Sequence, residues 1–310
     1  MKILVTGGAG FIASHVADEC VARRHGVVVL DDLSTGAMQN VNPKAVFLRA
    51  DIRDAGLDEL FRKERFDVVI HHAAQMDVRK SVEDPGFDAS VNILGTINLL
   101  ENTLRTGVKK FIFASTGGAI YGEQDYFPAD EEHPVRPLSP YGIAKLSVEK
   151  YLFYYAEVHA LQYVSLRYGN VYGPRQNPRG EAGVVAIFAE KMLAGGQPVI
   201  NGEGLQTRDY VYVGDVVSAN MFALGHDRSG IFNVGTGIET DVNTLFRTLR
   251  ELTGSTCKEE HGPAKKGEQL RSVLDARLLN RTFGWSAGTA IAEGLKMTVE
   301  YFRSRKKPDR

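Results

Sequence analysis

The feature that most restricts the fold of this chain is a regular alternation of short apolar runs and helical stretches over its first 170 residues. The apolar runs lie at 3–5, 27–30, 45–48, 67–70, 111–114 and 163–166. Apolar residues recur at helical spacing over 11–24, 56–64, 86–106 and 141–159. Buried parallel strands have such short apolar runs, and strands that alternate with helices predict an α/β fold with a doubly wound parallel sheet.

Beyond about residue 170 this alternation loosens. Gly and Pro collect at 173–183, 195–204 and 262–267. We therefore expect one domain over 1–170 and a smaller mixed α/β C-terminal lobe over 171–310. A helix near 215–225, followed by the apolar run 231–234, predicts that the chain re-enters the first domain around 215–235.

Composition excludes several classes of protein. The net charge of −1 provides no attraction for nucleic acid, and no apolar run approaches the roughly 18 residues that a membrane span needs. Only Cys20 and Cys257 are present, which argues against a disulfide framework or a zinc site. The start of the chain also lacks the pattern of a signal peptide. We expect a cytoplasmic protein without a metal, a nucleic-acid partner or a membrane anchor.

A glycine-rich turn follows the first expected strand. The segment Gly8-Ala9-Gly10-Phe11-Ile12-Ala13 fits G-x-G-x-x-G/A, and Gly7 adds a second phase, G-x-x-G-x-x-A. Glycines at these positions let the backbone approach a pyrophosphate, whose charge then lies at a helix N-terminus. The turn predicts a dinucleotide site that includes Gly7, Gly10, Phe11 and Ile12.

Carboxylates end the next two expected strands. Asp31 lies about 20 residues beyond the glycine turn, where a carboxylate accepts hydrogen bonds from the adenosine ribose hydroxyls. A carboxylate there repels a 2′-phosphate, so Asp31 favours NAD over NADP. Asp51 and Ile52 end the third strand and are candidates for the adenine edge, although a simple turn also explains them.

A candidate catalytic pair lies at the start of the helix expected over 141–159. Tyr141 and Lys145 are four residues apart and so share one helical face. A free phenol is about three pKa units too weak as a base at neutral pH, a gap of roughly 4 kcal/mol. A lysine ammonium and a nicotinamide cation can supply that stabilisation. Ser115 and Thr116, at the end of the fifth strand, are the candidate hydroxyls to hold the substrate oxygen.

Together these motifs resemble the extended short-chain dehydrogenases/reductases, and within them the UDP-glucose 4-epimerase branch. The resemblance runs nearly end to end and includes further motifs: His71-His72-Ala73-Ala74-Gln75, Asn92-Ile93-Leu94-Gly95-Thr96, Arg167-Tyr168-Gly169-Asn170-Val171-Tyr172-Gly173-Pro174-Arg175, Arg208-Asp209-Tyr210-Val211 and Asn233-Val234-Gly235-Thr236-Gly237. It implies an NAD-binding Rossmann domain over 1–170 and a nucleotide-sugar-binding lobe over 171–310.

Residue roles follow from the resemblance. Tyr141 would be the base, Lys145 its electrostatic support and a ribose ligand, and Thr116 the catalytic hydroxyl with Ser115 as fallback. Further implied cofactor residues are Ala73, Ala74 and Gln75 on the nicotinamide side, and Asn92 from the helix below. Asn170 and Arg208 would contact the diphosphate of a UDP-hexose. The family's interface implies a homodimer built on a four-helix bundle from the helices at 86–106 and 141–159.

Parts of the substrate lobe depart from the family pattern. Lys265 and Glu268 replace the usual Arg and Asp, and Arg271 is a possible substitute for the lost arginine. Gly169 replaces Phe or Ala, which predicts a missing wall of the sugar pocket. Ser272 aligns with the position that gates C2 substituents, and its small size predicts that N-acetylated sugars are admitted.

The segment after Thr116 separates the members of the superfamily. The 4,6-dehydratases resemble one another in an Asp-Glu pair there, whereas this chain has Gly117-Gly118-Ala119-Ile120. Elimination then lacks its acid and base. We predict an NAD-dependent isomerase that interconverts UDP-glucose and UDP-galactose through a transient 4-keto sugar, with their N-acetyl derivatives as further candidate substrates. The alternatives are another nucleotide-sugar dehydrogenase or 4,6-dehydratase of the superfamily, and an NAD-sensing regulatory module.

Overall fold

The computed structural model describes residues 1–179, 183–265 and 269–305. Its centre is a seven-stranded parallel sheet in the order β10-β6-β5-β4-β1-β2-β3. The strands of this sheet are β1 (Lys2–Thr6), β2 (Gly26–Asp31), β3 (Val46–Arg49), β4 (Val68–His71), β5 (Lys110–Thr116), β6 (Gln162–Tyr168) and β10 (Gly230–Val234). The expected doubly wound parallel sheet is confirmed.

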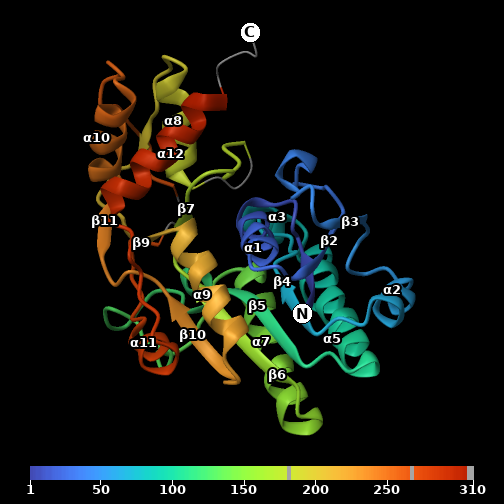
Figure 1. Cartoon of the computed structure of the whole chain (residues 1–310). Coiled ribbons are helices and arrows are strands. Elements are labelled where there is room, and N and C mark those ends of the chain that lie inside the picture. Colours follow the sequence, from blue (N-terminus) through green and yellow to red (C-terminus); the bar gives the residue numbers. More distant parts are fainter. Residues whose placement is uncertain (180–182, 266–268, 306–310) are drawn as a thin grey trace.

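Helices cover both faces of this sheet (Figure 1). The elements between its strands are α1 (Phe11–Ala22), η1 (Met38–Asn40), α2 (Leu57–Glu64), α3 (Val78–Glu83), α4 (Pro85–Ala89), η2 (Ser90–Leu94), α5 (Gly95–Thr106), α6 (Gly117–Ile120), α7 (Pro140–His159) and α9 (Val213–Gly225). One apolar core lies between the sheet and the side of α1 and α9, and a second lies on the side of α2, α5 and α7. The two cores explain why the strands have apolar residues on both faces.

The remaining elements form a smaller lobe around a four-stranded mixed sheet. In it β9 (Thr207–Tyr212) pairs with β7 (Asn170–Tyr172), β11 (Glu239–Asp241) and β13 (Arg271–Ser272). The other elements of this lobe are α8 (Val184–Leu193), β8 (Ile200–Asn201), α10 (Val242–Thr253), β12 (His261–Gly262) and α12 (Ile291–Arg305). Helix α11 (Arg277–Phe283) packs instead on β10 of the large sheet. A third apolar core joins α8, α10 and α12, which stand beside the large sheet in Figure 1.

Some sequence expectations about element bounds were wrong. The third strand is 46–49 rather than 45–48, because Val46 pairs with Val28 while Ala45 closes a turn onto Asn42. The first helix ends at Ala22 instead of continuing to 24, where Arg24 has a positive φ of 64°. The stretch 86–106 is three successive helical pieces, α4, the π-helical η2 and α5.

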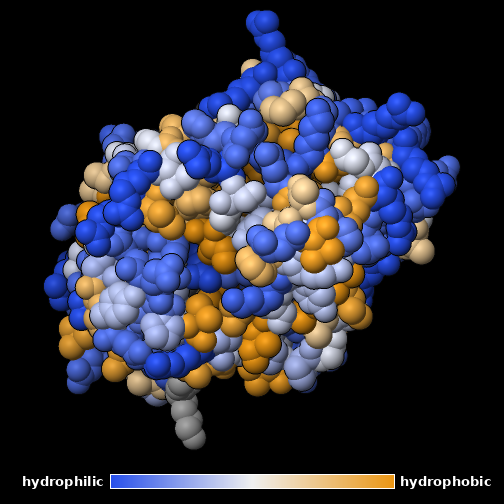
Figure 2. Space-filling view, turned by 90° about the horizontal axis from the view of Figure 1, so that it is seen from below, coloured by the Kyte–Doolittle hydropathy of each residue, from blue (hydrophilic) through white to orange (hydrophobic). Residues whose placement is uncertain are grey.

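None of the helices in the described ranges is long and apolar enough to span a bilayer. The face seen from below in Figure 2 has hydrophobic residues in several separate patches among hydrophilic ones.

Candidate active site

A cleft of about 980 Å³ opens at the carboxyl ends of the central strands. Such an edge of an open α/β sheet is where ligands bind in this class of fold. The cleft brings together most of the residues that the sequence singles out: Gly7, Gly10, Phe11, Ile12, Asp31, Asp51, Ile52, Ala73, Ala74, Gln75, Ser115, Tyr141 and Lys145.

The glycine turn between β1 and α1 has the backbone approach that a pyrophosphate site needs. Gly7 has a φ of +70°, and a Cβ there would lie 2.7 Å from Ala73 N, so only glycine fits. Gly10 N donates to Gly7 O and α1 begins at Phe11, which points the first amides of the helix toward the cleft. The turn therefore fits an anionic dinucleotide.

Asp31 ends β2 at the other side of this turn. Its two carboxylate oxygens accept from Ala9 N at 3.0 Å and Leu33 N at 2.8 Å, which fixes the side chain at the cleft. Burial raises the pKa of Asp31, and these two backbone hydrogen bonds oppose that shift. The remaining lone pairs can accept from a ribose, as the sequence predicts.

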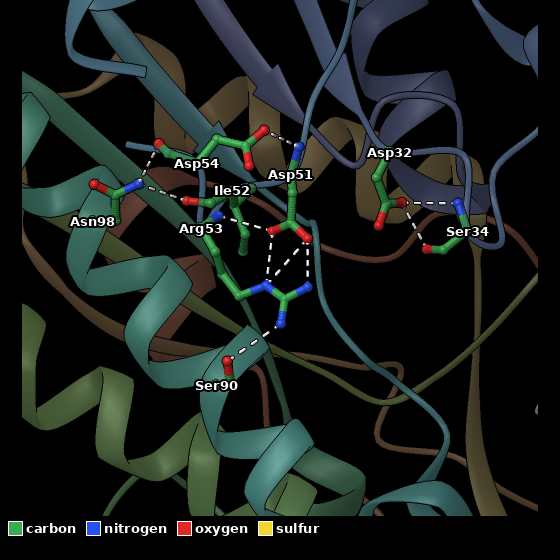
Figure 3. Close-up of polar contacts among 8 residues, drawn as sticks. All are labelled: Asp32, Ser34, Asp51, Ile52, Arg53, Asp54, Ser90 and Asn98. Atoms are coloured by element: carbon green, nitrogen blue, oxygen red, sulfur yellow. Dashed lines mark hydrogen bonds and ion pairs between the residues drawn. The ribbon is translucent and has the colours of Figure 1, made fainter. Parts of the chain in front are cut away.

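Asp51 also lines the cleft, but its carboxylate is already paired. Figure 3 shows that Arg53 folds back onto it, with Arg53 Nη2 2.6 Å from Asp51 Oδ2, and also reaches Ser90. The hydrogen bond to Arg53 lowers the pKa of Asp51. Asn98 holds the turn through the carbonyls of Ile52 and Asp54. On the loop after β2, Asp32 accepts a hydrogen bond from the Ser34 hydroxyl (Figure 3). The sequence did not indicate that Arg53 would pair with the Asp51 carboxylate.

Asn92 lies behind the cleft rather than in it. Its Oδ1 accepts from Gln75 N at 2.9 Å, and its Nδ2 donates to Gln75 O at 2.8 Å and to Asp88 Oδ1 at 3.0 Å. Asn92 thus supports the loop after β4 from the helix below. Asp88 completes this arrangement, and no sequence pattern pointed to it.

Tyr141 and Lys145 face the cleft from the first turns of α7. Ser139 caps that helix by accepting from Gly142 N, and Pro140 occupies its first position. Lys145 Nζ donates to Ala114 O at 2.8 Å and lies 5.7 Å from the centroid of the Tyr141 ring. Burial lowers the pKa of Lys145 to about 8. The buried ammonium is thus placed to stabilise a phenolate.

The two candidate hydroxyls differ in their surroundings. Ser115 is buried and donates to Glu149 Oε1 at 2.7 Å, so its hydroxyl is part of the interior. Thr116 is half-buried, and its Oγ1 and Asn170 Oδ1 both lie close to Gly118, 3.9 and 3.8 Å from the position of an ideal Cβ there. Thr116 and Asn170 therefore lie together at one side of α6.

Helix α6 contributes no acid. A Cβ at Gly117 would lie 2.4 Å from Leu274 Cδ1, so a larger residue at this position would have to displace the Leu274 side chain. Glu149 next to Ser115 is held by Arg167 in a buried two-point ion pair, with Arg167 Nη2 2.7 Å from Glu149 Oε2. A paired interior carboxylate of this kind is a poor general acid.

The substrate lobe places its two candidate arginines differently. Arg208 is half-buried on β9, where the carbonyls of Thr207 and Gln269 hold its guanidinium at 2.8 and 2.6 Å. Arg271 is not brought to the cleft: it pairs with Glu239 and stacks on Phe127, 3.7 Å from the ring centroid. Lys265 lies at the edge of the described chain, and Glu268 lies outside the described residues.

Two small residues complete the description of this lobe. Ser272 is 3 % exposed and pairs with Arg208 in the sheet register. Gly169 approaches β9 so closely that a Cβ would lie 2.9 Å from Asp209 O. The expected missing wall is therefore a close backbone contact, which glycine alone permits.

His71 and His72 end β4, and neither belongs to a cluster of metal ligands. Within the ranges that the structure describes, no group of three or more His, Cys, Asp or Glu side chains is placed to hold a metal ion. His71 lies between the hydroxyls of Thr6 and Thr96, at 2.6 and 2.9 Å. Burial lowers the pKa of both histidines.

Comparison with known proteins identifies the family of the chain. Residues 3–235 match the model of the NAD dependent epimerase/dehydratase family. A putative UDP-glucose 4-epimerase of Methanocaldococcus jannaschii is 47% identical over 302 residues, which cover 97% of this chain and 98% of the relative.

Solved structures agree with it. The UDP-glucose 4-epimerase of Thermotoga maritima with UDP-glucose has a TM-score of 0.97 and 49% identity, with 99% of this chain and 100% of that one covered. The enzyme of Thermus thermophilus with NAD has a TM-score of 0.92 and 46% identity, over 98% and 99% of the two chains.

Proposed function

Because the chain belongs to the NAD-dependent epimerase/dehydratase family, we propose that it is an NAD-dependent isomerase that interconverts UDP-glucose and UDP-galactose. The observation that carries this assignment is the Tyr141–Lys145 pair in a cleft built for a dinucleotide, beside a helix α6 that contributes no acid. Inversion at C4 needs a single base, whereas elimination needs an acid and a base.

The residues at the cleft have distinct roles in this proposal. The glycine turn and Asp31 would hold NAD, which would supply a reversible hydride acceptor for C4 of the sugar. Tyr141 removes the proton of the 4-hydroxyl and later returns it. Lys145 favours the phenolate by its charge, and Thr116 orients the hydroxyl by a hydrogen bond.

The second lobe holds the nucleotide. Arg208, whose guanidinium is held by two carbonyls, would donate a charge-assisted hydrogen bond to the diphosphate, and Asn170 would be a second contact. An arginine held in advance loses less side-chain entropy on binding. Since Ser272 is small and buried, we further propose that N-acetylated hexoses are accepted.

We also propose a homodimer through a four-helix bundle. Ile143, Tyr151, Tyr154 and Val158 lie along α7 at helical spacing and are 39–60% exposed. Phe87 on α4 and Leu94 in η2 add exposed apolar side chains to the helices that pack on α7. Two copies of α7 and of the α4–η2–α5 stretch would cover these residues. Sedimentation analysis of the wild type and Tyr154→Glu tests the interface, and a monomeric wild type would contradict it.

Proton NMR of the purified protein with UDP-galactose, with and without added NAD, tests the activity. UDP-glucose should appear without net NADH. Net NADH would indicate a dehydrogenase, loss of water a dehydratase, and NAD binding without any turnover a regulatory module.

The variant Tyr141→Phe tests the base. It should abolish turnover and leave NAD binding intact, because the phenyl ring keeps the shape of the wall. Activity above about a tenth of the wild type would overturn this assignment, since general-base catalysis contributes about 10²–10⁴-fold.

A further inference from the structure

A buried carboxylate behind the cleft has no role in the reaction described above. Asp88 on α4 is 1 % exposed, and its Oδ1 accepts from Gln75 Nε2 at 3.1 Å and from Asn92 Nδ2 at 3.0 Å. Its other oxygen, Oδ2, is buried and has no hydrogen-bond partner among the described residues. A buried charge without a paired cation is costly, so an asparagine would be the cheaper residue if only the hydrogen bonds mattered.

The Asp88 carboxylate is one of several titratable groups around the buried Lys145 ammonium. They are Tyr141 and Glu149 on its own helix, His71 and His72 at the end of β4, and Asp88 on α4, which packs on α7. Both histidines are buried bases that stay neutral at physiological pH. The two carboxylates are therefore the negative charges near the buried ammonium.

These two carboxylates are not equivalent. Arg167 binds both oxygens of Glu149, through Nε at 3.0 Å and Nη2 at 2.7 Å, so the charge of Glu149 is compensated locally. The partners of Asp88 are neutral amides. Among the described residues no cation is in hydrogen-bond contact with Asp88, so its negative charge acts on Lys145 without such competition.

We propose that Asp88 is a positioning residue that acts through Lys145 and keeps this buried amine protonated while Tyr141 works as the base. The proposal rests on the isomerase function and assigns to Asp88 a role that needs no contact with substrate or cofactor. The amides of Gln75 and Asn92 fix the carboxylate, and the unpartnered Oδ2 leaves its charge uncompensated.

The protonation equilibrium of Lys145 explains why such a charge matters. Burial lowers the pKa of Lys145 to about 8, and the charges of Asp88 and Glu149 act in the opposite direction. Near neutral pH the protonated form of Lys145 therefore exceeds the neutral amine by only a modest factor. Each further unit by which the pKa fell would reduce that excess tenfold.

The variant Asp88→Asn separates charge from shape. The amide oxygen can still accept from Gln75 and Asn92, and the amide nitrogen replaces the oxygen that has no partner. We expect kcat/KM for UDP-galactose at pH 8 to fall about fivefold, with the alkaline limb of its pH profile displaced to lower pH by about one unit and activity recovering toward pH 6. Glu83→Gln, an exposed charge removal on the neighbouring α3, should leave the profile unchanged.

A titration that needs no turnover completes the test. With ¹³C-labelled lysine, the signal that disappears in Lys145→Arg should titrate near pH 8 in the wild type and at lower pH in Asp88→Asn. Equal midpoints, or a uniform loss of kcat/KM at every pH, would overturn the proposal. A shifted midpoint in a protein that does not convert UDP-galactose would instead reject the isomerase function and leave the electrostatic coupling standing.

Discussion

Two neighbouring hydroxyls at the end of β5 show how the surroundings decide the role of a residue. The Ser115 hydroxyl is bonded to Glu149 inside the protein, while that of Thr116 lies beside Asn170 at α6. The resemblance to the epimerases ranked Thr116 first and kept Ser115 as a fallback. Because Ser115 shares its strand-end position, the sequence could not show which hydroxyl is already used.

We expect Thr116→Val and Ser115→Ala to have opposite effects. Thr116→Val should lower kcat by about 10²-fold with NAD affinity unchanged, since it removes a hydrogen bond to the reacting oxygen. Ser115→Ala should keep kcat within about threefold. It should lower the free energy of unfolding by about 1–3 kcal/mol, because the buried Glu149 carboxylate loses the hydrogen bond that the Ser115 hydroxyl donates. Steady-state kinetics and urea unfolding measure the two quantities. The reverse pattern would make Ser115 the catalytic hydroxyl.

Other important residues left no pattern in the sequence. Tyr141 and Lys145 could be found because four residues is one helical turn, and Asp31 because it ends a strand at a fixed distance from a glycine turn. Arg53 and Asp88 act through contacts set by tertiary packing. Arg271 was suggested by its charge, but in the fold Glu239 and Phe127 hold it at the surface.

At the scale of elements, the turn between β1 and α1 depends on contact with the loop after β4. We expect Gly7→Ala to weaken NAD binding by at least about tenfold and to destabilise the protein, because its Cβ would overlap Ala73 N at 2.7 Å. Gly107→Ala is the matched control: Gly107 also has a positive φ, of 73°, but nothing lies within 4 Å of its added Cβ. It should cost only about 1 kcal/mol of left-handed strain. Fluorescence titration with NADH measures the cofactor affinity of the two variants, and thermal melting measures their stability. Equal affinities and equal melting temperatures would contradict the prediction.

Helix α7 is anchored to the sheet by a buried ion pair one turn beyond Lys145. Glu149 and Arg167 are 1 % and 4 % exposed, and Ser115, Ser165 and Tyr121 satisfy the rest of the network. Glu149→Gln should lower the free energy of unfolding by about 3–5 kcal/mol, because it leaves the Arg167 charge buried without its partner. Glu157→Gln, on the exposed side of the same helix, should change it by less than about 0.5 kcal/mol. Similar urea midpoints for the two variants would contradict this role.

The stretch 86–106 shows the limit of periodicity as a guide to elements. Its apolar spacing predicted one helix, but Pro85 starts α4, and the π-helical η2 follows before α5. A π turn shifts the register by one residue, and here it places Asn92 where its side chain binds the backbone of Gln75 on both sides. Hydrophobic spacing alone cannot reveal such a shift, because the tertiary hydrogen bonds that favour it come from distant residues.

At the scale of the molecule, the first lobe followed from the sequence more readily than the second. Strands buried on both faces give long apolar runs that mark the central sheet. The strands β8, β12 and β13 have two residues each and exist because a neighbour pairs with them. Such short pieces have no period of their own, so the second lobe was expected only as a mixed α/β unit.

Acid sensitivity is a further property of the whole molecule, and it comes from the two histidines at the end of β4. The Thr96 hydroxyl donates to Asn92 O, so His71 Nε2 donates to Thr96, and Thr6 donates to His71 Nδ1. Tyr168, which receives Asn220 Nδ2, donates to His72 Nε2 in the same way. Both rings are therefore held neutral, and burial lowers the pKa of His72 to about 3.

The sign of the pH dependence follows from these neutral rings. The folded pKa values lie below the unfolded value of about 6.5, so the stabilisation is complete above that pH and is lost as pH falls below it. Each histidine should lower the free energy of unfolding by about 1.6 kcal/mol in total between pH 6.5 and pH 5, a window above the usual titration of carboxylates. Urea unfolding across this window measures the slope. His72→Gln should remove about half of it, and the exposed His159→Gln should leave it unaltered. An equal slope in all three proteins would show that the two buried rings do not determine the response to acid.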